Sequence, residues 1–130
     1  MGTRAVVHTD LRPAGIGKDI WIATHWDGDP ASLGSDLRRE IILQKKKWKK
    51  DYSTLKPNMG SIIQEAVVRA SAGHSIDEMS TSGKSNFNYG DFAEYEYEID
   101  AKTGKIKVRE RMGQWSENKA KKWKQLSKIL

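Results

Sequence analysis

The sequence predicts a single α+β domain spanning residues 1–130, in which an antiparallel sheet of about four strands packs against three helices in the order ββααββα. Two segments near the N-terminus and two on either side of residue 102 have the composition of paired strands. Apolar residues recur at helical spacing between these two pairs. The last residues predict a third helix, and a chain of 130 residues can bury one modest core.

The first strand pair is predicted at residues 4–9 and 19–24, because both segments are rich in β-branched and aromatic residues. Turn-forming residues fill the stretch 12–18 between them. A hairpin across this stretch would place His8 opposite about Ile20. The same pairing would bring the start of the first strand beside the end of the second.

A long helix is predicted to begin at Asp29-Pro30, because Asp is a preferred N-cap and Pro is favoured at the first helical position. The helix is expected to end before Lys56-Pro57, since the residue before a proline disfavours helical geometry. Its core-facing stripe, at 3.6 residues per turn, consists of Leu33, Leu37, Ile41, Gln44, Trp48, Tyr52 and Leu55. Ile42 and Leu43 lie off this stripe.

A second helix is predicted from about Asn58 to the residue before Gly73, which is a suitable C-terminal glycine. Its apolar residues follow the helical spacing at Met59, Ile62, Ile63, Ala66, Val67 and Ala70. Residues 75–89 are rich in Ser, Gly and Asn, so a loop is expected there.

The second strand pair is predicted at residues 92–100 and 105–112, where charged and apolar residues alternate strictly. A four-residue turn with Gly104 in the left-handed conformation would join them. The expected opposite-charge pairs are Asp100 with Lys105, Glu98 with Lys107, Glu96 with Arg109 and Glu94 with Arg111. The alternate residues Tyr97, Ile99, Ile106 and Val108 would then face the core.

The closing helix is predicted over residues 116–130, with Ser116 as N-cap and Trp123 as its main apolar residue. The formal charge of the chain is +6, and it is concentrated in residues 38–50 and 115–130. The chain has no cysteine, which excludes disulfides and thiolate metal sites. No apolar run is long enough to span a membrane and no signal-peptide core is found, so a soluble cytoplasmic protein without a membrane partner is expected.

The hexapeptide His25-Trp26-Asp27-Gly28-Asp29-Pro30 is the most chemically dense part of the sequence, at a strand-to-helix junction. The first hairpin would place Arg4 opposite Thr24 or His25. An arginine, an imidazole and two carboxylates are therefore expected to gather at one corner. The candidate ligand-binding or structural corner consists of Arg4, His25, Trp26, Asp27 and Asp29.

Two interpretations of this corner are open. An imidazole with carboxylates can bind a divalent metal or act in general acid–base catalysis. In the structural interpretation, Asp29 caps the helix and Gly28 provides a special backbone angle. We favour the structural interpretation, because Gly28 and Pro30 break the extended geometry. The predicted hairpin would also keep His8 roughly 16 Å from His25, too far to share an ion. No catalytic residue, metal ligand or cofactor is assigned.

Two lysine-rich segments are candidate nucleic-acid contacts, because lysines bind phosphates while an aromatic ring between them can stack on a base. The candidate contacts are Lys45, Lys46, Lys47, Lys49, Lys50, Lys119, Lys121, Lys122 and Lys124. Trp48 lies on the core stripe, which argues against stacking on a base, and Trp123 could likewise belong to the core. The two segments would form one footprint only if they share a face.

The opening Met1-Gly2-Thr3-Arg4, followed by the His-Trp-Asp-Gly hexapeptide, resembles a group of small proteins from phage, bacterial and archaeal genomes. Members of that group begin Met-x-Thr-Arg and carry His-Trp-Asp-Gly-Tyr-Pro before a helix. Asp29 occupies the position where the group usually has Tyr. The resemblance implies a shared fold and site location in the N-terminal part, and it implies no activity.

Taken together, these patterns predict a non-enzymatic intracellular binding module whose partner is nucleic acid or an acidic protein. Two alternatives remain. One is a small-molecule, metal or catalytic site at the His-Trp-Asp-Gly corner. The other is a structural or assembly protein of phage-like origin, for which an apolar patch including Ile42 and Leu43 would serve as the self-association surface.

Overall fold

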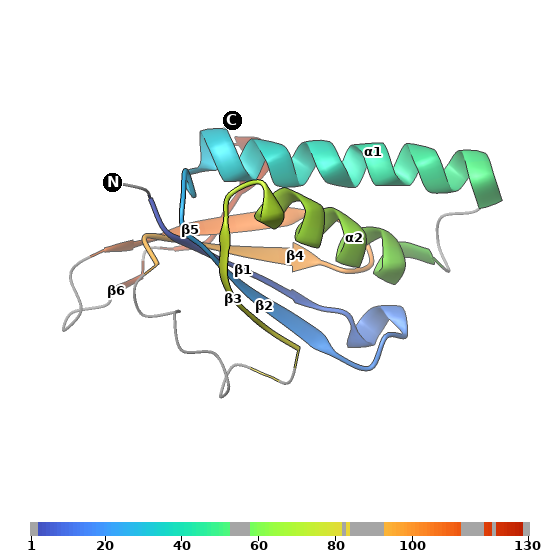
Figure 1. Ribbon diagram of the computed structural model, residues 1–130, viewed down its shortest axis with the longest axis horizontal. Helices are drawn as coiled ribbons and strands as arrows, with labels where there is room; N and C mark the ends of the chain where they lie inside the picture. The colour runs from blue at the N-terminus through green and yellow to red at the C-terminus, as the bar shows by residue number, and fades with distance from the viewer. Residues whose placement is uncertain are drawn as a thin grey trace.

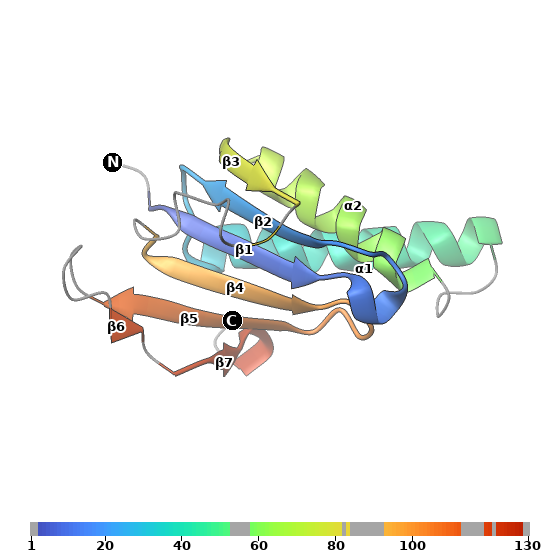
Figure 2. The ribbon, with the colours of Figure 1, turned by 90° about the horizontal axis from the view of Figure 1, so that it is seen from below.

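The computed structural model describes residues 3–52, 58–81, 83, 93–112, 119–120 and 122–128. These residues form a mixed sheet in the order β3-β2-β1-β4-β5-β6, and β7 also pairs with β5. Both long helices lie on one side of the sheet (Figures 1 and 2). The strands are β1 (Ala5–Asp10), β2 (Asp19–Thr24), β3 (Ile76–Ser80), β4 (Tyr95–Asp100), β5 (Ile106–Met112), β6 (Lys119–Ala120) and β7 (Lys124–Gln125). The helices are α1 (Ser35–Tyr52) and α2 (Met59–Ala72).

The α+β class is confirmed, but the antiparallel four-stranded sheet with three helices is wrong. β1 pairs with β4 in parallel, with Val7 opposite Tyr97. The two predicted hairpins therefore join into one mixed sheet with β1 and β4 adjacent. The alternation of residues within each hairpin specifies how its two strands pair. The pairing of β1 with β4 depends instead on how the chain crosses through the helix layer, and no short segment of the sequence specifies that path.

The first hairpin forms as predicted but its register differs by one residue. His8 lies opposite Trp21 rather than Ile20, and Asp10 lies opposite Asp19. The observed register puts Ile20 on the same face as Thr9, toward the core. The predicted register would have placed this isoleucine on the face that carries His8, so burial of apolar surface selects the observed one.

The register of the second hairpin is confirmed, with Glu96 opposite Arg109 and Glu98 opposite Lys107. Tyr97, Ile99, Ile106 and Val108 are buried as predicted. Gly104 has a φ of +76°, the left-handed conformation that the turn requires. The Asp100 carboxylate stabilises the same turn by accepting backbone N–H bonds from the two residues at 102 and 103.

The helix layer begins with a short π-helical turn, Pro30–Gly34, that continues into α1. Asp29 is its N-cap residue, as predicted, although its side chain makes no capping bond to the backbone. Residues 53–57, which include the predicted stop, lie outside the described residues. α2 follows the predicted boundaries, and Gly73 is its C-cap. Both helices bury their apolar stripes against the core face of the sheet.

Two predicted segments have a different structure. β3 forms within the expected loop 75–89 and adds an edge strand beside β2. In place of the closing helix, β6 and β7 pair with β5 and a 3₁₀ turn, Leu126–Lys128, follows. The segment has few apolar residues at helical spacing, and backbone bonds to the open edge of β5 compensate for the lost helix. Ser116 lies outside the described residues. In the part of the chain that is described, no helix combines the length and apolarity needed to cross a membrane.

Candidate functional site

The His-Trp-Asp-Gly corner is held together mainly by the backbone of Gly28. Its N–H donates to the Thr3 carbonyl at 2.8 Å, and the buried Tyr97 hydroxyl donates to its carbonyl at 2.7 Å. A Cβ at this position would lie 2.6 Å from the Cβ of Ala5. Glycine is therefore required by close approach to β1. The special backbone angle predicted for Gly28 is wrong, because its φ is not positive and the left-handed residue of this turn is Asp27.

The polar side chains of this corner are paired differently from the prediction. His25 Nδ1 lies 3.0 Å from the Asp77 carboxylate on β3, rather than bonding to Asp27 or Asp29. Asp27 is exposed with a φ of +50°. Within the described residues, no ion pair joins Arg4 to these carboxylates, and no group of three or more His, Asp or Glu is arranged to hold a metal ion.

A buried histidine that sequence reasoning left unassigned ties this corner to the helices. His74 Nδ1 lies 2.9 Å from the Trp26 carbonyl, and Nε2 lies 2.7 Å from the Asp36 carboxylate. The carbonyl of His74 also accepts the N–H groups of His25 and Trp26. These contacts join segments distant in the chain, so no spacing in the sequence could have revealed them. They give His74 a structural role.

The second polar cluster lies on the sheet face away from the helices, and it was also missed. His8 Nδ1 lies 2.8 Å from the Glu98 carboxylate, and Nε2 lies 3.3 Å from Asp19. Trp21 stacks on the imidazole with ring centroids 3.8 Å apart, and its Nε1–H donates to Asp19. Burial lowers the pKa of His8, but the hydrogen bonds and charges of Glu98 and Asp19 outweigh burial, so the pKa is raised overall.

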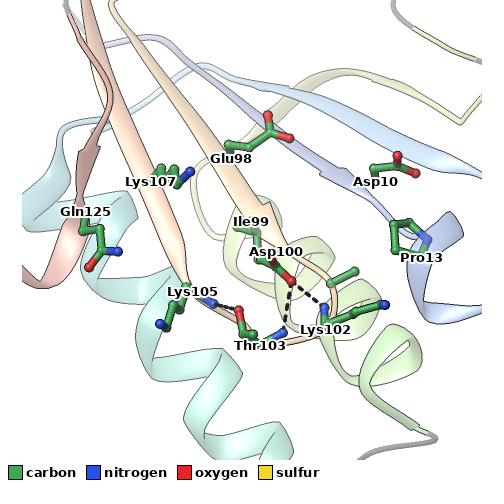
Figure 3. A pocket seen from close by; sticks show the side chains of 11 residues that line it. Asp10, Pro13, Glu98, Ile99, Asp100, Lys102, Thr103, Lys105, Lys107 and Gln125 are labelled. Atoms are coloured by element: carbon green, nitrogen blue, oxygen red, sulfur yellow. Dashed lines mark hydrogen bonds between the residues drawn. The ribbon is translucent and has the colours of Figure 1, made fainter.

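An open pocket of about 550 Å³ adjoins this cluster at the carboxyl ends of β1 and β4 (Figure 3). Its three carboxylates already have internal partners. Glu98 forms a hydrogen bond with His8, and Asp100 accepts hydrogen bonds from backbone N–H groups of the turn. Asp10 accepts two hydrogen bonds from the Arg12 guanidinium. These bonds, together with the Arg12 N–H, lower the pKa of Asp10. Among the described residues, the remaining charged side chains of the pocket make no hydrogen bond or ion pair. They are all cationic: Lys102, Lys105 and Lys107.

The first lysine-rich segment lies on α1 and is largely solvent-exposed. We call its exposed cationic side chains the outer basic face; they are Arg38, Arg39, Lys46, Lys47, Lys49 and Lys50. Lys45 is half-buried and donates to the Thr103 carbonyl at 3.2 Å, outside this face. Trp48 packs against the core, as the stripe predicted. The C-terminal half of α1 extends past the ends of the strands in both views (Figures 1 and 2).

The second segment lies at the β5 edge of the sheet. Lys122 and Lys124 are exposed, Lys119 belongs to β6, and Lys121 lies outside the described residues. Trp123 is not a core residue: it is 37% exposed, and the Arg109 guanidinium lies 4.4 Å from its ring centroid. The core interpretation of this tryptophan depended on a helix that does not form.

Arg38, near the N-terminal end of α1, lies close to the β5 edge of the sheet. A small pocket of about 170 Å³ is lined by Arg38 of α1, Lys105 at the start of β5 and Gln125 of β7. Lys105 and Gln125 also line the larger pocket on the open face of the sheet. Arg38, Lys105 and Lys107 therefore connect the N-terminal end of α1 to the β5 edge, whereas the C-terminal end of α1 and β6 lie toward opposite ends of the molecule (Figure 2).

Comparisons with protein-family models, with curated proteins and with solved structures find no match to this chain. The resemblance of the N-terminal motifs stays a prediction.

Proposed function

We propose that the protein is a non-enzymatic module that binds nucleic acid through the outer basic face of α1. The observation that carries this proposal is the density of unpaired cationic charge on that face. Arg39 pairs with Asp36 at 2.9 Å. The other five members make no ion pair with any described carboxylate. From Arg38 to Lys50 the helix rises about 18 Å, and the cations stand in two groups at the ends of this length, with the exposed Ile42 and Leu43 between them.

Without a bound anion, repulsion between these cationic side chains destabilises α1. Lys46 lies one helical turn from both Lys49 and Lys50, and like charges at this spacing destabilise a helix by about 0.2–0.5 kcal/mol per pair. A row of phosphates would relieve this repulsion and release counterions on binding. Binding of a polyanion would therefore offset the repulsion between these side chains.

Self-association through the same helix is less well supported. Ile42 and Leu43 are exposed, and they are the apolar residues on which an assembly role would depend. Arg38 and Arg39 line the same shallow surface pocket as these two residues. A second copy docked there in register would oppose cation to cation, which costs free energy. Nucleic acid carries the opposite charge, so its contact with the same surface is electrostatically favourable.

The test is binding of a labelled DNA duplex of about 20 base pairs, measured by fluorescence anisotropy over a range of salt concentrations. The variant Lys46→Gln/Lys50→Gln removes two charges from the outer basic face. The matched control Lys18→Gln/Arg69→Gln removes the same net charge from the β1–β2 loop and from α2. Each lost phosphate contact reduces the slope of log K against log salt by about 0.9, so the first variant is expected to reduce it by about 2.

The control variant is expected to keep the slope of the wild type. No detectable binding of the wild type at about 25 mM salt, where electrostatic affinity is strong, would refute the proposal. An equal loss in both variants would also refute it, because net charge rather than this face would then determine the affinity.

A further inference from the structure

We propose that the strand pair β5–β7 is a stacking site for single-stranded nucleic acid, in which Trp123 contacts a base and the lysines around it contact phosphates. This inference rests on the proposed function and specifies the form of nucleic acid that the second surface takes. The sequence pattern suggested that an aromatic residue between lysines could stack on a base. The structure removes Trp48 from that role and leaves Trp123 in the exposed position.

The Trp123 ring is exposed and held in place. It is 37% exposed, and the Arg109 guanidinium packs over it at 4.4 Å from the centroid. Arg109 is in turn anchored by the Glu96 carboxylate at 2.9 Å. An aromatic ring supported in this way loses little side-chain entropy on binding, which favours stacking of a further planar group.

Cationic and amide side chains also lie along the segment that carries this ring and on the neighbouring strand β5. Lys122 and Lys124 flank it in sequence and are exposed. Gln125 lies opposite Lys107 in the β5–β7 pair, and both line the open pocket of about 550 Å³ in Figure 3. The carboxylates of that pocket are held by internal hydrogen bonds, so among the described residues its lysines are the charged groups free to contact a phosphate. A stacking ring combined with lysines that can contact the backbone phosphates is the combination that binds single strands without sequence preference.

The chemistry favours a single strand over a duplex. In a duplex both faces of each base are covered by neighbouring bases, whereas a single strand can unstack a base onto a protein ring. The site is also continuous with the outer basic face of α1, since Lys105 and Gln125 line both the open pocket and the small pocket beside Arg38. A strand bound at Trp123 can therefore extend toward α1.

The test compares binding of an oligo-dT of about 15 nucleotides and of a duplex of the same length. Trp123→Ala is expected to weaken oligo-dT binding by about fivefold or more, the equivalent of about 1 kcal/mol for one stacked base, and to leave duplex binding within about twofold. Trp26→Ala is the matched control: Trp26 is 47% exposed, and its ring contacts His25 rather than a cationic side chain. This variant should bind both probes like the wild type.

A second readout does not depend on the stability of the alanine variant. Oligo-dT is expected to quench the tryptophan fluorescence of the wild type, and Trp123→Phe should lose most of that quenching while keeping most of the affinity. Wild-type affinity for oligo-dT in Trp123→Ala, or unchanged quenching in Trp123→Phe, would overturn the stacking site. Duplex binding and its sensitivity to Lys46→Gln/Lys50→Gln report separately on the proposed function.

Discussion

The substitution Gly28→Ala tests whether the His-Trp-Asp-Gly corner is held by close backbone approach. The new Cβ would lie 2.6 Å from the Ala5 Cβ and 2.8 Å from the Thr3 carbonyl oxygen, and an ordinary contact begins at 3.4 Å. The corner must therefore move back by 0.8 Å or more. Overpacking of this kind costs about 1–3 kcal/mol. The same movement stretches the 2.8 Å bond from Gly28 N–H to Thr3 beyond hydrogen-bond distance, which adds about 0.5–1.5 kcal/mol.

We expect Gly28→Ala to lower the free energy of unfolding by about 1.5–4.5 kcal/mol, measured by urea denaturation followed by circular dichroism. The matched control is Gly17→Ala, because a Cβ at Gly17 would meet no atom within 4 Å. The control is expected to change stability by less than about 0.5 kcal/mol, or to raise it slightly through the unfolded state. A Gly28→Ala protein within about 0.5 kcal/mol of the wild type, with an unchanged denaturant slope, would refute the steric argument.

Two further predictions concern hydrogen-bonded side chains of the sheet. Because Glu98 and Asp19 raise the folded-state pKa of His8, its stabilising contribution should be complete below the unfolded value of 6.5 and disappear as pH rises through the higher folded-state pKa. His8→Phe should remove this part of the pH dependence of unfolding between neutral and mildly alkaline pH, and an unchanged pH profile would contradict the assignment. Tyr97→Phe removes the bond to the Gly28 carbonyl and should lower the free energy of unfolding by about 0.5–1.5 kcal/mol. Thermal unfolding measures this change, and an unaltered midpoint would contradict a stabilising role for the bond.

The helices and hairpins could be predicted because their determinants lie close together in the chain. The alternation of charged and apolar residues in β4 and β5 specifies both their register and their buried face. The apolar stripe of α1 likewise identifies Trp48 as a core residue through its helical spacing. The position of Asp29 as N-cap follows from the same short-range rules.

Tertiary structure alone decided how these elements combine. The parallel pairing of β1 with β4 brings His8 to Glu98 across 90 residues of sequence, and no local pattern encodes that contact. The chain after β5 follows the open sheet edge instead of forming a helix, which exposes Trp123 and places Gln125 beside Lys107. Strand pairing and side-chain burial depend on which distant segments meet, so the candidate stacking site became visible only once the sheet was assembled.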